Sequence, residues 1–260
     1  MIDLEKAKQA FSEYVKPYDI NNPKIALKIE HTYRTVEVAK KIAETLNLDE
    51  EQIKLAGLIG LLHDIGRFEQ LRIYDTFWDK DSIDHGDFAV KILFEDRLIR
   101  NFIQEEKYDE TIYKAIKNHN KFIIEEGLTK EELIHAKIIR DADKTDIFVV
   151  FVKDIEENKN VLYDYEKVSK QEIDKIIMKD FENHRQSDRN NFKNDIDDYI
   201  NIIGFIFDYN FSYGLNIIKE NYYIERVIKP IYICEETKEQ LDKIVKIANT
   251  YLEERIKKGC

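Results

Sequence analysis

The stretch Leu58-Ile-Gly-Leu-Leu-His-Asp64 is apolar until it ends in an adjacent histidine and aspartate. Asp49 is a good N-cap for a helix that runs from there to about His63. A helix that is apolar on every side is buried, so we place this one at the centre of a helical bundle. His63 and Asp64 then stand where the chain leaves the most buried helix, and there the backbone can turn both side chains toward one ion.

The composition of the chain predicts an all-α fold. Among 260 residues there are only 8 glycines and 3 prolines, while 36% of the residues are charged and 43% are hydrophobic. The formal net charge of −11 argues against an extended nucleic-acid groove, because bulk phosphate binding needs a basic face. It still permits a small anionic substrate, because a metal ion and a few basic residues can make a local positive pocket.

Apolar periodicity predicts where the helices lie and where the chain changes character. Helical patterns cover 3–16, 24–46, 49–63, 82–95, 109–119 and 130–155, and then 170–185, 191–209, 211–222 and 236–257. Residues 64–80, which mix charges with Gly66 and Trp78, are expected to form an irregular loop. We expect a helical core domain over 1–155 and a C-terminal helical extension over 156–260 that packs on it.

Neither cysteine usage nor the N-terminus points to export or to a membrane. Cys234 and Cys260 stand too far from any ligand pattern to suggest a disulfide framework or a zinc knuckle. The first residues are charged, and the longest apolar runs are far too short for a membrane span. We therefore expect a cytoplasmic protein without a membrane partner.

Four histidines and two aspartates occupy helix positions that point inward. His31, for example, shares its stripe with Leu27, Val38 and Ile42. A lone histidine among apolar neighbours is more often a packed core residue than a ligand, but an aspartate is rarely buried without a partner. Shared metal coordination explains the whole set. Its members are His31, His63, Asp64, His85, His119 and Asp143.

Asp143 is one of three acidic candidates in a single helical segment. Its neighbours at helical spacing are apolar, whereas Asp141 shares its face with Lys137 and Thr145. Asp146 has an intermediate phase, which suits a residue that orients a ligand histidine. Imidazole and carboxylate without thiolate suit Mn, Fe, Ni, Co or Zn in an open catalytic site.

These motifs resemble the HD-domain superfamily of metal-dependent phosphohydrolases, whose signature is H…HD…D. The resemblance covers about residues 22–155 and rests on His31-Thr-Tyr-Arg34, Gly60-Leu-Leu-His-Asp-Ile-Gly-Arg67, Asp84-His-Gly86, Asn118-His-Asn120 and Ile139-Arg-Asp-Ala-Asp-Lys144. It implies one or two divalent metal ions (Mn, Fe, Ni, Co, Zn or Mg). The first would be held by His31, His63, Asp64 and Asp143. His85 and His119 match the extra histidines of the dinuclear branches, in which Asp64 would bridge to a second metal.

The sequence also departs from particular branches of that superfamily. The cyclic-di-nucleotide phosphodiesterases have paired histidines and a Gly-Tyr-Pro segment, whereas this chain has Asn118 before His119 and no such segment. Their lysine three positions after the His-Asp pair is Arg67 here. The resemblance therefore implies a reaction class and leaves the substrate open.

The implied reaction is cleavage of a phosphomonoester or phosphodiester of a small phosphorylated molecule, with a nucleotide as the expected substrate. Metal-bound water ionises near neutral pH and attacks phosphorus as hydroxide. Asp64 would position it, and Arg67 would offset the charge that develops on the phosphoryl group. Arg34 and Lys144 are further candidates for substrate binding. For each basic residue the alternative is a solvated surface charge.

Two other functions share the same ligand set. A dinuclear iron oxygenase of the same superfamily, resembling inositol oxygenase, uses similar ligands to activate O₂, because ligands alone do not fix the metal. A non-catalytic binding or regulatory module would keep the metal for structure. A homodimer is the default expectation for assembly.

Overall fold

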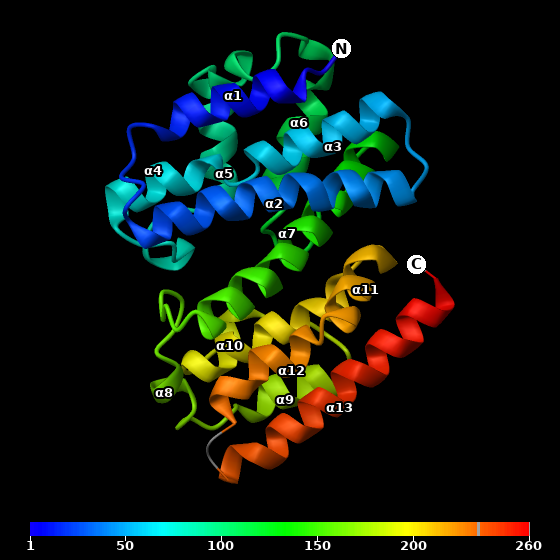
Figure 1. The fold of residues 1–260 in the computed structure, drawn as a ribbon. Helices are drawn as coiled ribbons and strands as arrows, with labels where there is room; N and C mark the ends of the chain where they lie inside the picture. Colours follow the sequence, from blue (N-terminus) through cyan, green and yellow to red (C-terminus); the bar gives the residue numbers. More distant parts are fainter. Residues whose placement is uncertain (233–234, 260) are drawn as a thin grey trace. The chain divides into compact units, whose positions relative to one another are not determined.

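The computed structural model describes residues 1–232 and 235–259, and these residues form helices and no strand (Figure 1). The prediction of an all-α fold is confirmed. Cys234 and Cys260, and with them the expectation that they form no disulfide or zinc site, lie outside the described residues. The α-helices are α1 Leu4–Val15, α2 Pro23–Thr45, α3 Glu50–Leu62, α4 Ile65–Tyr74, α5 His85–Val90, α6 Asp109–Asn118, α7 Lys130–Glu156, α8 Tyr165–Val168, α9 Lys175–Glu182, α10 Asp195–Gly204, α11 Ser212–Glu220, α12 Tyr223–Ile228 and α13 Glu235–Lys258.

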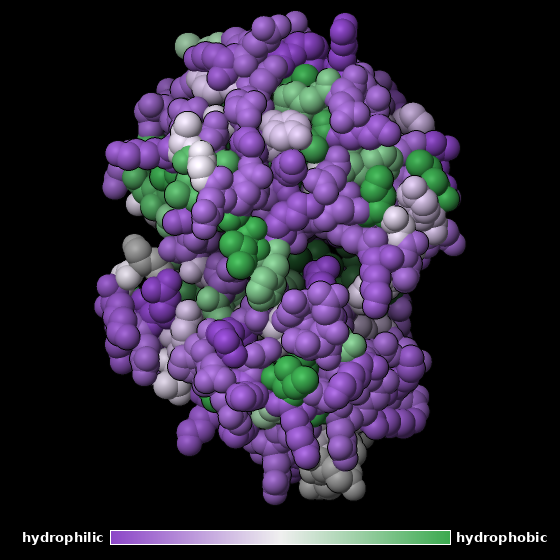
Figure 2. All heavy atoms as spheres, turned by 180° about the vertical axis from the view of Figure 1, so that it is seen from behind, coloured by the Kyte–Doolittle hydropathy of each residue, from purple (hydrophilic) through white to green (hydrophobic). Residues whose placement is uncertain are grey.

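The chain divides into two compact units, residues 1–146 and 147–260, each with a hydrophobic core of its own. The division falls inside α7, whereas the sequence analysis places the boundary between core and extension after residue 155. Within the described residues, no helix has the length and apolar character needed to cross a bilayer. Figure 2 shows that hydrophilic side chains cover most of the visible face, with apolar residues in scattered patches.

Helix α3 lies in the centre of the first unit, as its apolar sequence predicts. Every residue from Leu55 to Leu62 is buried, and the Asp49 side chain accepts a hydrogen bond from the Gln52 amide at 2.9 Å to cap the helix. Gly60 lets α2 and α3 come close, because a Cβ there would lie 3.1 Å from the Cα of Val36. This close contact brings the middle of α2 alongside the end of α3 (Figure 1).

The expectation of an irregular loop over 64–80 is wrong for its first part, which forms α4. Ile65, Phe68 and Leu71 recur at helical spacing and are all buried, so the segment has an apolar face that the mixed charges around it obscure. The later residues contain a short 3₁₀ turn, Asp79–Asp81.

The second unit is built around buried aromatic and aliphatic side chains of several short helices. Tyr199 of α10 is fully buried, and its hydroxyl donates to the carbonyl of Val227 in α12. Buried Asp154 near the end of α7 accepts from the Val161 amide at 2.9 Å and the Tyr165 hydroxyl at 2.6 Å. Helices α8 and α12, which the sequence patterns do not predict, belong to this core.

Substitution of Gly66 by alanine tests the close approach of α4 to α5. A Cβ at this position would lie 2.8 Å from the Ala89 nitrogen and 2.9 Å from the His85 oxygen, and backbone atoms cannot move aside cheaply. We expect Gly66→Ala to reduce the free energy of unfolding by about 1–3 kcal/mol. Gly204→Ala is the control, because its nearest neighbours would lie at an ordinary 3.8 Å. Thermal unfolding followed by circular dichroism measures both, and equal melting temperatures would contradict the steric argument.

Candidate metal centre

The four histidines and two aspartates of the sequence pattern converge in the first unit. Their ligand atoms form three overlapping groups, each within 4.8 Å, and these groups are His31, His63 and Asp64; His63, His119 and Asp143; and Asp64, His85 and His119. Five of the side chains are almost fully buried, and Asp143 retains 17% exposure. The side chains come from six places in the chain, namely α2, the C-cap of α3, the residue before α4, the start of α5, the C-cap of α6, and α7.

Asp64 lies between two pairs of histidines. Its Oδ2 is 3.5 Å from the Nε2 atoms of both His31 and His63. Its Oδ1 is 3.6 Å from Nε2 of His85 and 3.8 Å from Nε2 of His119. One carboxylate therefore faces both pairs, one oxygen to each.

The two sides differ in their remaining ligands. On the Oδ2 side, Asp143 Oδ1 lies 3.1 Å from His31 Nε2 and 3.7 Å from His63 Nε2. We call His31, His63, Asp143 and Oδ2 of Asp64 the first half-site. On the Oδ1 side, the Nε2 atoms of His85 and His119 are 3.0 Å apart. These two histidines and Oδ1 of Asp64 form the second half-site.

Each histidine is held from behind through its other ring nitrogen. Carboxylate and carbonyl oxygens only accept hydrogen bonds, so Nδ1 carries the proton in every ring and Nε2 presents a lone pair to the site. The acceptors are Asp146 Oδ2 for His31 at 2.7 Å, the Gly60 carbonyl for His63 at 2.8 Å, Asp79 Oδ2 for His85 at 2.5 Å and the Ile116 carbonyl for His119 at 2.6 Å.

The donor set fits divalent cations. Nε2 of His31 and Nε2 of His63 are buried and have no hydrogen-bond partner, although both face carboxylate oxygens. In neutral rings these lone pairs face anionic oxygens, and either a proton or a divalent cation removes the repulsion. Burial opposes a charge on His31, but the carboxylates of Asp143 and Asp146 raise its pKa to about 8, which shows how strongly this place attracts positive charge. The arrangement can hold one divalent ion in each half-site, with Asp64 shared.

Nearby charges hold the shared carboxylate ionised. Burial works against the charge, but the cations Lys28 and Arg67 hold the pKa of Asp64 well below its usual range. Burial also lowers the pKa of His85, and together with the charge of Arg67 it brings that pKa to about 3. His85 therefore stays neutral at physiological pH, and the neutral imidazole is the form that can bind a metal ion.

Two basic residues stand at the metal centre. Lys28 Nζ lies 2.6 Å from Asp64 Oδ2, and Arg67 Nε lies 3.6 Å from Asp64 Oδ1. Both cations also lie against the ring of Phe77, at 5.6 and 5.7 Å from its centroid. Arg67 was singled out from the sequence. Lys28 was not, although it lies one helical turn before His31 and so shares its face.

The other two basic candidates lie elsewhere. Arg34 donates from Nε to Asp146 Oδ1 at 2.6 Å and from Nη2 to Oδ2 at 3.0 Å, so its guanidinium lies behind His31. Lys144 is buried in α7, with 6% of its surface exposed.

A buried arginine fixes the backbone that carries His119. Arg140 of α7 donates from Nη1 to the carbonyls of Asn118, at 3.0 Å, and of Lys121. Its side chain is 3% exposed, so these bonds are shielded from water. The loop after α6 is therefore held against α7, the helix that supplies Asp143.

Residues 29–147 match the family model described as HD domain. This segment is an HD domain. Members of that family are commonly hydrolytic and bind divalent metals. The HD domain spans all six converging residues and lies almost entirely within the first unit. No curated protein and no solved structure matches the chain.

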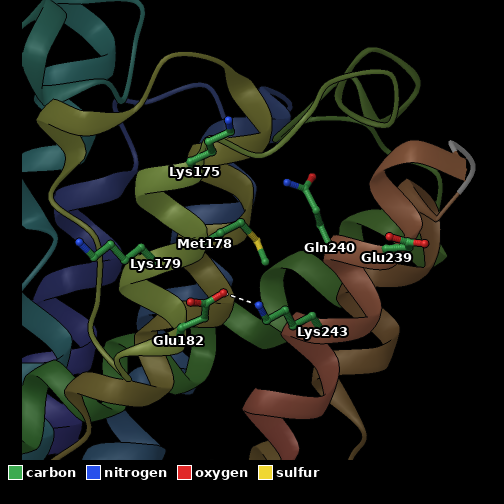
Figure 3. A pocket seen from close by; sticks show the side chains of 7 residues that line it. All are labelled: Lys175, Met178, Lys179, Glu182, Glu239, Gln240 and Lys243. Carbon is green, nitrogen blue, oxygen red and sulfur yellow. Dashed lines mark hydrogen bonds and ion pairs between the residues drawn. The ribbon is translucent and has the colours of Figure 1, made fainter.

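The second unit has a pocket of its own, which contains none of these residues. It is an open space of about 400 Å³ between α9 and α13 (Figure 3). Its lining carries lysines and glutamates of opposite charge, and Lys243 forms an ion pair with Glu182. Exposed, mutually neutralising charges of this kind do not indicate a reaction.

The buried His135 of the HD domain has a structural role that pH should reveal. Its Nε2 donates to Gln52 Oε1 at 2.6 Å, while its Nδ1 is buried without a partner, so protonation would bury an unpaired donor. Burial lowers the pKa of His135 to about 4. The unfolded chain, with an ordinary pKa near 6.5, takes up the proton first, so stability falls as the pH drops through this interval.

We therefore expect the free energy of unfolding to fall further in wild type than in His135→Gln when the pH is lowered from 7 to 4.5. The two decreases should differ by on the order of 2 kcal/mol. Glutamine keeps a donor for Gln52 but does not titrate. Urea unfolding at the two pH values, with a chelator present so that cation release contributes nothing, measures the difference. Identical pH dependence in the two proteins would show that His135 is not the titrating group.

Proposed function

We propose that this chain is a metal-dependent phosphohydrolase that cleaves a phosphomonoester or phosphodiester of a small molecule, with a nucleotide as substrate. The observation that carries the proposal is the position of Asp64, whose two oxygens face two histidine pairs while Lys28 and Arg67 lie beside them. The HD-domain match supports the reaction class.

The first half-site would hold one divalent ion through His31, His63, Asp64 and Asp143, and the second would hold another through His85, His119 and Asp64. Such ions, when bound, supply an activated water and Lewis-acid polarisation of the phosphoryl oxygens. The role of Asp64 is to fix both sets of ligands in one geometry. Because its carboxylate is buried and ionised, it needs no reorganisation when substrate arrives.

Lys28 and Arg67 would bind the phosphoryl oxygens and offset the negative charge that develops on them. Both are cationic, both are mostly buried, at 15% and 13% exposure, and both lie within 4 Å of the shared carboxylate. At such short distances and largely out of water, the attraction between these cations and phosphoryl oxygens is strong. We assign Arg34 to the support of His31, because Asp146 occupies its guanidinium. Lys144 remains a weaker candidate for substrate binding, since little of it is exposed.

Aromatic side chains of α4 and of the turn that follows it support a nucleotide substrate. Phe77 lies under the two cations, and the next residue, Trp78, is 51% exposed. Tyr74, at the end of α4, is 44% exposed. An exposed indole or phenol ring offers a stacking face for a base at low cost in conformational entropy.

Replacement of Asp64 by asparagine tests the central residue. We expect Asp64→Asn to lose phosphate release down to the rate without enzyme, because the shared anionic ligand is gone, while the far-ultraviolet circular dichroism stays that of wild type. The assay is a screen of purified protein with Mn²⁺, Fe²⁺, Co²⁺, Ni²⁺, Zn²⁺ or Mg²⁺ against nucleotides and bis-p-nitrophenyl phosphate. Asp81→Asn, an exposed aspartate in a nearby turn, is the matched control.

An active Asp64→Asn enzyme would overturn this mechanism. Oxygen uptake by the iron-loaded protein, with no hydrolysis of any substrate, would instead favour the oxygenase branch of the same superfamily.

The two basic residues are tested separately from metal binding. Lys28→Gln and Arg67→Gln are each expected to lower kcat/KM by about 100-fold, the usual cost of losing one group that stabilises transition-state charge. Cation affinity should stay the same or rise in Lys28→Gln, because the lysine competes for Asp64 Oδ2. Lys41→Gln on α2, which is 56% exposed, is the control. Loss of cation binding in Lys28→Gln would contradict its assignment to substrate.

A further inference from the structure

Asp79 lies outside every motif that the sequence analysis uses, yet its carboxylate joins a ligand histidine to the arginine at the site. It stands in the 3₁₀ turn between α4 and α5. Its Oδ2 accepts from His85 Nδ1 at 2.5 Å, and its Oδ1 accepts from Arg67 Nη1 at 2.9 Å. One side chain therefore sets both the ring orientation of His85 and the position of the Arg67 guanidinium.

The turn that carries Asp79 is fastened to α4 from several sides. Gln70, which is fully buried, donates from Nε2 to Asp79 Oδ1 at 3.0 Å, to Ser82 Oγ at 2.9 Å and to the Ile83 carbonyl at 3.0 Å. Arg67 Nη1 also donates to the Phe77 carbonyl at 2.6 Å. The hydrogen bonds from Gln70 and Arg67 hold both the carboxylate and its turn, so Asp79 approaches the site in a defined geometry.

The two half-sites are electrostatically unequal. The first has two carboxylates, one oxygen of Asp64 and Asp143, and one cation beside them, Lys28, at 2.6 Å from Asp64 Oδ2. The second has one oxygen of Asp64 as its charged ligand, and the Arg67 cation intrudes, with Nη2 only 3.3 Å from His85 Nε2. A cation that entered the second half-site would meet this positive charge at close range.

We propose that Asp79 is a positioning residue that enables the second half-site to bind a divalent cation, by holding the His85 ring and neutralising Arg67. This inference rests on the proposed function only in taking the half-sites as cation sites. According to this inference, the first half-site binds a divalent cation more tightly than the second. Cation binding at the second half-site depends on Asp79, which is not itself a ligand. Carboxylates that bind the back of a ligand histidine commonly change metal affinity by about 10–100-fold when they are replaced.

The proposal is tested by titrating the full chain with Mn²⁺ after treatment with a chelator. Isothermal calorimetry and the electron paramagnetic resonance signal of free Mn²⁺ monitor binding, so the test does not depend on turnover. Wild type is expected to bind two ions, the second more weakly. Asp79→Asn keeps the side-chain shape and removes the charge, and it should weaken only the second ion, by about 10–100-fold. Asp81→Asn, in the same turn, is the control and should bind both ions as wild type does.

A variant at the first half-site provides the complementary comparison. Asp146→Asn should weaken the tighter ion, because Asp146 holds His31 as Asp79 holds His85. Two ions bound by Asp79→Asn with wild-type affinity would overturn the inference, and so would equal weakening of both ions. Two ions bound by wild type, with no phosphate released from any substrate, would overturn the proposed function and leave the role of Asp79 intact.

Discussion

The buried carboxylate of Asp64 is the constraint on which the first unit depends. An ionised aspartate with 3% exposure is costly unless cations and donors surround it. Here it stands where α3 ends and α4 begins, so His63 and Asp64, although adjacent, both face the site. The close packing at Gly60 brings α2 alongside, and Lys28 supplies a charge at 2.6 Å. Fold and site therefore share one requirement, which is the neutralisation of a charge placed at the centre of a helical core.

The ligand rings are fixed by a second layer that repeats one arrangement. In each half-site an arginine binds an aspartate, and that aspartate binds the Nδ1 of one histidine. The two chains are Arg34–Asp146–His31 and Arg67–Asp79–His85. The remaining histidines use backbone carbonyls near the ends of their own helices. The difference lies in the arginines, because Arg34 stays behind its aspartate, whereas Arg67 also reaches Asp64 and His85. Similar supports thus serve two half-sites that each face a basic side chain, Lys28 at the first and Arg67 at the second.

Helical phase in the sequence points five of the six converging residues inward, because each of the five shares a stripe with apolar neighbours in a predicted helix. Asp64 follows the end of such a helix and was included because it directly follows His63. The intermediate phase of Asp146 suggested that it orients a histidine, and its hydrogen bond to His31 Nδ1 agrees with that role. Helix α4 was missed because its three buried apolar residues are interspersed with three charged ones and with a glycine that allows close contact with α5. Lys28 was within reach, one turn from His31. Asp79 could not be found from the sequence, because a residue in a turn has no helical phase. Its distance from His85 depends on how α4 and α5 pack together.

The acidic character of the chain and its proposed anionic substrate are compatible because they act over different distances. A net charge of −11 spread over the surface is screened within about 8 Å at physiological ionic strength. Lys28 and Arg67 instead lie within 4 Å of the shared carboxylate and largely out of water, where the effective dielectric constant is low. A small phosphorylated molecule that enters the site meets this local field, whereas a long polyanion would also have to lie along the acidic surface. This charge distribution is therefore compatible with the small anionic substrate proposed above.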